Sequence, residues 1–199
     1  MANRYAKSQV SDETTYQKKL KITQNHMTPQ MQVLEFGCGT GSTAIVHAAY
    51  VNHILAVDSS AAMLDIATAK AADAQIRNIS FELSSIEDLK RTDHSFDMVM
   101  GHSILHLVDD RDPVIAKSFD LLKPGGTFIT STTCIGKTSR ILKALLPVGY
   151  ALGLLPLVRF FSIDELVQSI VQAGFVVEEQ WLPDGSDAVF IIARRPAKE

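Results

Sequence analysis

The stretch VLEFGCGTG, residues 33–41, runs from an apolar strand into a turn rich in glycine. Three glycines allow the backbone to turn tightly and let a ligand approach it closely. The helix predicted next, residues 42–50, begins with free N–H groups that favour a carboxylate or a phosphate. Asp58 ends the second predicted strand, residues 53–57, where an acidic side chain can accept hydrogen bonds from both hydroxyls of a ribose. These features together predict a nucleoside-binding site at the end of the first strand.

Two ligands fit this frame, a dinucleotide and S-adenosylmethionine. A dinucleotide fingerprint, G-x-G-x-x-G, requires glycine at position 42, where this chain has Ser42. Glu35 lies two residues before the first glycine, and its carboxylate would repel a pyrophosphate but attract an ammonium and a sulfonium. The residues therefore favour S-adenosylmethionine. A glycine turn without a ligand is the structural alternative, and the combination of Glu35, Asp58 and the glycines argues against it.

Short apolar runs alternate with helical segments along the chain, which is typical of an α/β domain with a mostly parallel sheet. The predicted strands cover residues 32–36, 53–57, 79–83, 96–101, 127–132, 175–182 and 188–193. The predicted helices cover Ser11 to about His26, then 42–50, 60–72, 113–122 and 163–173, the last capped by Ser162 or Asp164. Residues 123–126, KPGG, predict a turn before the fifth strand. The last two strands are joined by only PDGS, residues 183–186, so they must be antiparallel.

Composition predicts one globular domain over residues 1–199. The chain has 46% hydrophobic and 21% charged residues and a net charge of −3. It has no basic excess, so we expect no nucleic-acid partner. Its two cysteines, Cys38 and Cys134, are too few for a disulfide scaffold, and nothing near them has metal-ligand spacing, so we expect no metal and a reducing compartment. The N-terminus has no apolar core of a signal peptide, which predicts a cytoplasmic location.

The residues resemble class I (Rossmann-like) S-adenosylmethionine-dependent methyltransferases, and the small-molecule branch more than the branches that act on nucleic acids. The resemblance covers most of the chain. It rests on a series of motifs in the right order: residues 33–41, Asp58-Ser59-Ser60 with Met63, SFDMV at 95–99 followed by SILHL at 103–107, LLKPGG at 121–126, and AGF at 173–175.

The resemblance implies a doubly wound sheet of seven strands in the order 3-2-1-4-5-7-6, with strand 7 antiparallel and helices on both faces. It also implies S-adenosyl-L-methionine as cofactor, over the carboxyl ends of the first strands. The cofactor-binding residues it implies are Glu35, Gly37, Cys38, Gly39, Gly41, Asp58, Ser59, Met63, Ser85, Ile86 and His102. Ser85 stands where the family often has an acid that accepts from the adenine amino group.

Methyl transfer from a sulfonium mainly requires alignment and exclusion of water, and a general base is needed only for a protonated nucleophile. Candidates for a base or an acceptor-binding group are His106, Tyr16 and His102. Each has a structural alternative, since His106 fits a packed histidine and Tyr16 an ordinary core contact. We expect Cys38 to be no nucleophile, because no base lies near it.

The very apolar segment 141–161 is the best indication of the acceptor. It belongs to a predicted insertion, residues 136–162, while residues 1–30 are predicted to form an N-terminal helical cap. Charged residues, proline and glycine interrupt the segment, so it is no membrane span. The interpretations, in order of preference, are a wall of an apolar acceptor pocket, a homodimer face, or a segment at a membrane interface. The acceptor is therefore predicted to be small and apolar or lipid-like.

Two other functions stay open at this point. A nicotinamide-dependent oxidoreductase is opposed by Ser42 and Glu35, and no Tyr-x-x-x-Lys pair is placed for hydride chemistry. A non-catalytic protein that binds S-adenosylmethionine would keep the same fold and the same cofactor residues.

Overall fold

The structure is a computed structural model, and it describes residues 13–134, 159–183 and 186–197. The strands are β1 (Gln32–Phe36), β2 (His53–Asp58), β3 (Ile79–Leu83), β4 (Phe96–His102), β5 (Leu122–Thr133), β6 (Val176–Trp181) and β7 (Ala188–Arg194). The helices are α2 (Glu13–Asn25), α3 (Ser42–His47), α4 (Ala61–Asp73), α5 (Arg111–Leu121) and α7 (Ile163–Gln172), with a 3₁₀ turn, η1, at Ala48–Tyr50.

All seven strands form one sheet in the order β3-β2-β1-β4-β5-β7-β6. Strands β1 to β5 pair in parallel, and β7 is antiparallel to both of its neighbours. The predicted doubly wound sheet is therefore confirmed. The chain leaves β1 toward β2 on one side and later returns to β4 on the other, so the switch point of the sheet, where open α/β sheets bind ligands, lies between β1 and β4.

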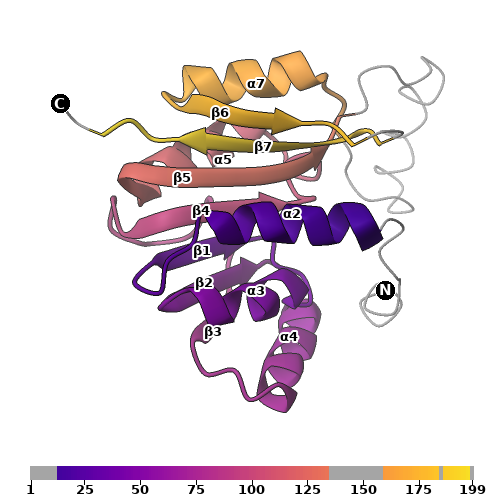
Figure 1. Ribbon diagram of the computed structural model, residues 1–199, viewed down its shortest axis with the longest axis vertical. Helices are drawn as coiled ribbons and strands as arrows, with labels where there is room; N and C mark the ends of the chain where they lie inside the picture. Colours follow the sequence, from indigo (N-terminus) through magenta and orange to yellow (C-terminus); the bar gives the residue numbers. More distant parts are fainter. Residues whose placement is uncertain (1–12, 135–158, 184–185, 198–199) are drawn as a thin grey trace.

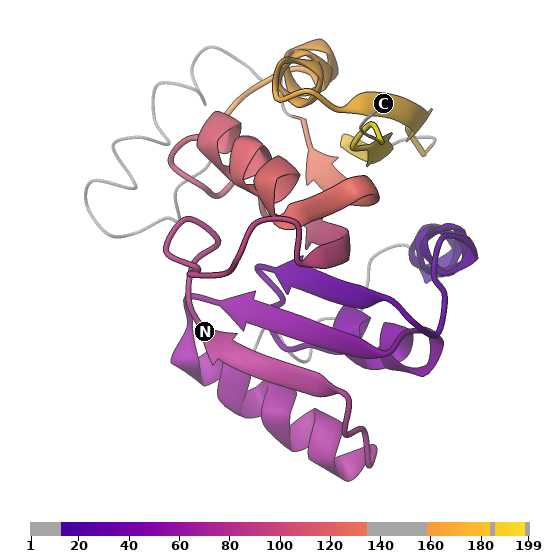
Figure 2. The same ribbon diagram turned by 90° about the vertical axis from the view of Figure 1, so that its left-hand side faces the viewer.

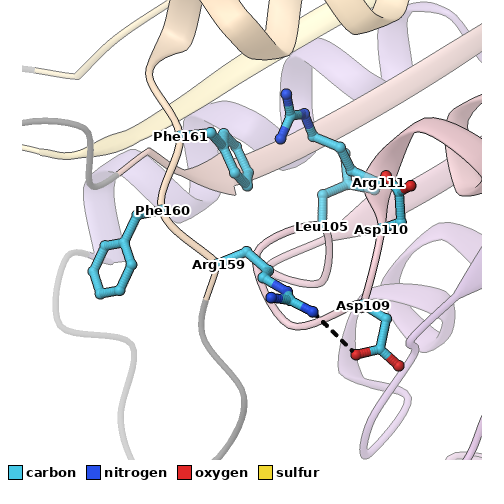
Figure 3. A pocket seen from close by; sticks show the side chains of 7 residues that line it. All are labelled: Leu105, Asp109, Asp110, Arg111, Arg159, Phe160 and Phe161. Carbon is cyan, nitrogen blue, oxygen red and sulfur yellow. Dashed lines mark hydrogen bonds and ion pairs between the residues drawn. The ribbon is translucent and has the colours of Figure 1, made fainter. Parts of the chain in front are cut away.

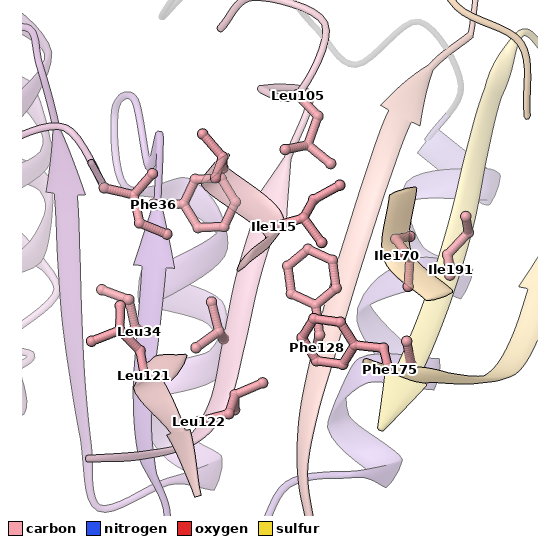
Figure 4. Packing of buried hydrophobic residues seen from close by; sticks show 14 of the residues in the cluster. Leu34, Phe36, Leu105, Ile115, Leu121, Leu122, Phe128, Ile170, Phe175 and Ile191 are labelled. Atoms are coloured by element: carbon pink, nitrogen blue, oxygen red, sulfur yellow. The ribbon is translucent and has the colours of Figure 1, made fainter. Parts of the chain in front are cut away.

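Helices cover both faces of the sheet. Helix α2 crosses in front of the sheet in Figure 1, with α5 behind it, and Figure 2 shows the two helices on opposite sides. Residues of α5 and α7 pack with Leu34, Phe36 and Phe128 in one core, part of which is shown in Figure 4. Residues of α3 and α4 pack with Val33 and Met100 in the other. Burial on both faces explains why these strands are nearly continuous apolar runs.

Two helix starts are set by side-chain caps. The Ser162 hydroxyl accepts a hydrogen bond from the Glu165 amide at 3.1 Å, and the Glu165 carboxylate accepts one from the Ser162 amide at 2.7 Å, which completes a capping box. Ser162, rather than Asp164, is thus the cap of α7. Asp110 caps α5 by accepting from the Asp112 amide at 3.0 Å, so this helix begins two residues before the predicted position 113.

The predicted turn at residues 123–126 is wrong, because β5 already begins at Leu122 and includes these residues. The Gly125 amide donates to the Arg195 carbonyl, and the Arg195 amide donates to the Gly126 carbonyl, both at 2.9 Å. Gly125 has a φ of 80° and the register with β4 shifts between Phe96 and Met98, which is the geometry of a bulge. Pairing with the chain beyond β7 therefore extends the strand through a sequence that resembles a turn.

The other boundaries differ by one or two residues, and the helix predicted over 42–50 divides into α3 and η1. The predicted helix start at Ser11 and most of the insertion 136–162 lie outside the described residues. Within the described ranges, no helix is both long enough and apolar enough to cross a membrane.

Candidate functional site

The loop after β1 contains three glycines and presents part of its backbone to open space. Gly37, Gly39 and Gly41 have φ values of 63°, 53° and 70°, a region that favours glycine. A Cβ atom added at Gly37 would lie 2.6 Å from Cγ1 of Ile104, so the loop packs tightly there. A Cβ added at Gly39 would meet no atom within 4 Å. Gly39 therefore borders open space in which a ligand can approach the backbone.

Asp58, at the end of β2, fixes this loop. Its Oδ2 accepts from the Gly39 amide at 2.8 Å, and its Oδ1 accepts from the Ser60 amide at 2.9 Å. A carboxylate oxygen has two lone pairs, so both oxygens can still accept from hydroxyls. Ser59 beside it is exposed and Met63 is half-buried. The arrangement suits a ribose, as the sequence predicts.

Lys70 of α4 also hydrogen-bonds to this loop, and the sequence pattern does not predict this contact. Its Nζ donates to the Thr40 carbonyl at 3.2 Å and to the Ser42 hydroxyl at 2.6 Å. Partial burial lowers the pKa of Lys70. A lysine in a helix rich in alanine has the pattern of a solvent-facing residue, so nothing in the sequence indicates this contact.

Glu35 is the fourth of the five residues of β1 and lies on the face covered by α2 and α3. Its side chain is 2% exposed, and within the described residues its Oε2 has no hydrogen-bond partner. Burial raises its pKa to about 8, so at neutral pH the carboxyl group is largely protonated. Tyr16 of α2 hydrogen-bonds to Thr43 and faces Glu35, and burial is the main cause of its raised pKa. A cationic ligand nearby would favour the ionised form of Glu35.

A second polar group of side chains lies on the same face of the sheet. The Lys19 ammonium of α2 donates to the Ser131 hydroxyl of β5 at 2.8 Å. Burial, His47 and Lys19 together lower the pKa of His102, at the end of β4, to about 3. His47 of α3 is fully buried, which lowers its pKa to about 4. The structure thus adds Lys19, His47 and Ser131 to the His102 that the sequence selects.

Four other predicted residues are held by local hydrogen bonds or are buried. The Ser85 hydroxyl donates to Asp88 Oδ2 at 3.0 Å and accepts from the Asp88 amide at 3.1 Å, and Ile86 is buried in the core. Their contacts with adenine stay predictions. The carbonyl of His106 accepts from the Arg159 amide at 2.8 Å, and burial lowers the pKa of its imidazole. Burial also raises the pKa of the Cys38 thiol, which fits the expectation that it is no nucleophile.

A pocket of about 250 Å³ lies between the loop after β4 and the end of the apolar segment 141–161 (Figure 3). Arg159 pairs with Asp109 at 3.3 Å, and the Arg111 guanidinium lies 4.6 Å from the Phe161 ring centroid. The residues that line the pocket are Leu105, Asp109, Asp110, Arg111, Arg159, Phe160 and Phe161. Three residues at the end of segment 141–161 thus line this pocket, together with the charged side chains of Asp109, Asp110 and Arg111, and the role of the segment as the wall of an acceptor pocket stays a prediction. In the part of the chain that is described, no three His, Cys, Asp or Glu side chains are grouped to hold a metal ion.

Known proteins with similar sequences are methyltransferases. A ubiquinone biosynthesis O-methyltransferase of Albidiferax ferrireducens is 33% identical over 135 residues, which are 66% of this chain and 53% of that protein. A demethylmenaquinone methyltransferase of Leptospira interrogans is 36% identical over 110 residues, 53% of this chain and 44% of that protein. The aligned part spans only 30% to 60% of the length of such curated relatives.

Solved structures agree with the fold. An S-adenosylmethionine-dependent methyltransferase from Mesorhizobium loti superposes with a TM-score of 0.76 at 20% identity, covering 92% of this chain and 99% of that one. The cyclase SpnF superposes with a TM-score of 0.79 at 16% identity, covering 96% and 85%. At such identities the likeness concerns the fold alone. The model of the family described as "Methyltransferase domain" matches residues 27–154, well over half of the chain. The chain therefore belongs to this methyltransferase domain family.

Proposed function

We propose that this chain transfers a methyl group from S-adenosylmethionine to a small-molecule acceptor. The observation that carries the proposal is the open backbone at Gly39, which Asp58 holds at 2.8 Å beside the buried carboxyl group of Glu35. Such a site suits a ligand with ribose hydroxyls and positive charge near the loop, where a dinucleotide would place its negatively charged pyrophosphate. The family and the named activities of the relatives support the same assignment.

The residues at this site fit S-adenosylmethionine, and each of them would contact a different part of it. Asp58 would accept from the ribose hydroxyls, and the loop from Gly37 to Gly41 would contact the methionine part with its backbone. Glu35 would balance positive charge from beneath the loop. Bound there, the cofactor supplies an electrophilic methyl group on a good leaving group. The protein then has to align the acceptor in line with the methyl group and exclude water.

For the acceptor we propose a small, apolar or lipid-like molecule. Leu105, Phe160 and Phe161 give the pocket in Figure 3 an apolar part beside its four charged side chains, which supports this choice. The relatives named for ubiquinone and menaquinone biosynthesis support it as well. We further propose a cytoplasmic location, consistent with two free, buried cysteines, and a homodimer formed through segment 141–161 as the alternative role of that segment.

Calorimetric titration with S-adenosylmethionine and, separately, with NAD tests the cofactor. We expect saturable binding of the first only, and at least tenfold weaker binding by Asp58→Asn, because one carboxylate oxygen becomes a donor. Asp65→Asn, at an exposed position on α4, is the matched control and should bind like the wild type. Binding of NAD alone, or of neither ligand, would refute the proposal.

Release of labelled methyl product in a screen of hydroxylated quinones and lipids separates an enzyme from a non-catalytic binding protein. The fold likeness to the cyclase SpnF makes this second step necessary, since the fold also serves another reaction. Binding without transfer to any acceptor in the screen would favour the non-catalytic alternative.

A further inference from the structure

Buried polar atoms without partners gather between α2 and the sheet. Within the described residues, five buried side-chain nitrogen or oxygen atoms have no hydrogen-bond partner. Four of them lie on this face: Thr23 Oγ1 of α2, Glu35 Oε2 of β1, and both ring nitrogens of His47 in α3. Each such atom costs about 1–3 kcal/mol unless something pairs with it. Such a concentration indicates a site that is completed by a polar ligand or by water.

Partly exposed polar side chains border this site at the carboxyl ends of β4 and β5. His102 and Ser131 end up side by side there, because they are paired in the parallel register of the two strands. Lys19 reaches them from α2 and donates to the Ser131 hydroxyl at 2.8 Å. His102 and Lys19 are half-buried, whereas His47, Glu35 and Thr23 are closed off beneath them. The ammonium and the imidazole therefore line the accessible end of the polar site.

The charges here favour an anion. Lys19 supplies a positive charge that is partly shielded from water, where its attraction for an anion is stronger than in solution. Burial, together with His47 and Lys19, keeps the His102 imidazole neutral, with a pKa of about 3, so it is a poor proton acceptor. A neutral imidazole still donates one N–H. Glu35 on this face is buried with a raised pKa, and Glu179 of β6 lies 3.8 Å from His26 of α2.

We propose that Lys19 and His102 form an oxyanion subsite that binds the methyl acceptor through an anionic oxygen, as a phenolate or a carboxylate. This inference rests on the proposed methyl transfer and names the accepting atom. The acceptor loses its proton to solvent before it binds. A lone pair of the anionic oxygen then forms the O–C bond, the C–S bond breaks with its electron pair passing to sulfur, and a neutral ether or ester and a neutral thioether result. His102 acts here as a hydrogen-bond donor, so the step needs no general base.

The probe for the test is 4-nitrophenol, whose ionised form absorbs visible light, titrated against pH with and without saturating S-adenosylhomocysteine. We expect saturable binding and a pKa of the bound phenol about one unit below its value in water, equivalent to tenfold tighter binding of the phenolate. Lys19→Met should abolish this shift. His102→Leu should weaken phenolate binding about tenfold, while His102→Asn, which keeps an N–H donor, should stay within about threefold of the wild type.

Matched controls come from the same elements. Lys18→Met removes the same charge from α2, but its ammonium lies 3.9 Å from the Trp181 ring centroid, so it should leave the phenol unaffected. His53→Asn, which loses a hydrogen bond to Ser80, controls for loss of a histidine. Competition by benzoate decides between the two acceptor classes: Lys19-dependent displacement indicates a carboxylate, and failure to displace indicates a phenolate.

Absence of saturable 4-nitrophenol binding, or an equal pKa shift in Lys19→Met, overturns the subsite. Failure of S-adenosylhomocysteine to bind the wild type overturns the methyl-transfer assignment instead, and the phenol titration without it still reports on the subsite. Circular dichroism and thermal melts identify any variant that fails to fold, in which case the milder Ser131→Ala, which releases Lys19 from its hydrogen bond, replaces it and should change the phenol shift.

Discussion

Replacing Glu35 by glutamine should make the protein more stable at alkaline pH and flatten its pH dependence. Glu35 is buried in β1, and within the described residues its Oε2 has no partner. Glutamine has nearly the same size and cannot ionise. The substitution therefore removes one thing, the free-energy cost of holding a carboxylate in this position.

The size of the effect follows from the raised pKa. Glu35 titrates at about 8 in the folded chain against an ordinary value of 4.5, and at about 1.4 kcal/mol per pH unit this corresponds to about 5 kcal/mol. Between these two pH values the folded state holds a proton that the unfolded state has released. The free energy of unfolding of the wild type therefore falls as pH rises through this window, by at most about 1.4 kcal/mol per unit. The glutamine variant lacks this contribution and should gain up to about 5 kcal/mol over the wild type by pH 9.

Urea denaturation at pH values from 5 to 9 measures the difference directly. The lowered pKa values of His47 and His102 reduce stability only as pH falls below about 6.5, and they do so equally in both proteins. The contributions of His47 and His102 therefore cancel in the difference between the wild type and Glu35→Gln. Glu87→Gln, at an exposed position, should keep the wild-type pH dependence. Parallel stability curves for wild type and Glu35→Gln across the whole range would refute the claim that Glu35 is buried with its proton.

Three further substitutions test the loop and the frame around it. Gly101→Ala would place a Cβ 2.2 Å from the Phe36 ring and should cost about 1–3 kcal/mol in urea denaturation; an unchanged midpoint would mean that the ring moves freely. Ser162→Ala removes the capping box of α7 and should lower the free energy of unfolding by about 1 kcal/mol, with amide exchange rising first at the helix start; protection equal to the wild type would contradict this. Lys70→Met removes the donor to Thr40 and should weaken S-adenosylmethionine binding several-fold in calorimetry while changing the melting temperature little; a large loss of stability with intact binding would assign Lys70 a purely structural role.

Most strands of the sheet could be predicted because the pattern of their own residues identifies them. The run 54–57 is apolar throughout, and in 33–36 only Glu35 interrupts the apolar residues, which in a chain that alternates strands and helices indicates burial on both faces. The antiparallel end of the sheet followed from a four-residue connection that cannot reach across for a parallel pair. The tight turn after β1 was predictable as well, because three glycines in five residues indicate backbone in the left-handed region, whereas the binding of ribose by Asp58 stays a prediction.

The extended β5 could not be predicted from its own residues. The sequence KPGG at 123–126 contains proline and two glycines, and local propensity favours a turn. The hydrogen bonds that hold it as a strand come from Arg195, about seventy residues later in the chain. The Arg195 guanidinium, also buried, donates to the Leu122 carbonyl at 3.0 Å and fixes the beginning of the same strand. Tertiary pairing therefore overrides the local preference.

The polar side of α2 illustrates a deeper limit of sequence patterns. An amphipathic helix is expected to turn its apolar face to the core, so the stripe that contains Lys19 and Thr23, four residues apart, indicates solvent, whereas Tyr16 fits a core contact. In the structure this stripe faces the sheet, and only Leu20 and Thr23 of the helix are buried. A helix that buries so little apolar surface gains little from the hydrophobic effect and depends on polar contacts such as that between Lys19 and Ser131. A ligand that pairs with the polar atoms beneath it would therefore also strengthen the docking of α2, so the same contacts that select an anionic acceptor would close the helix over it.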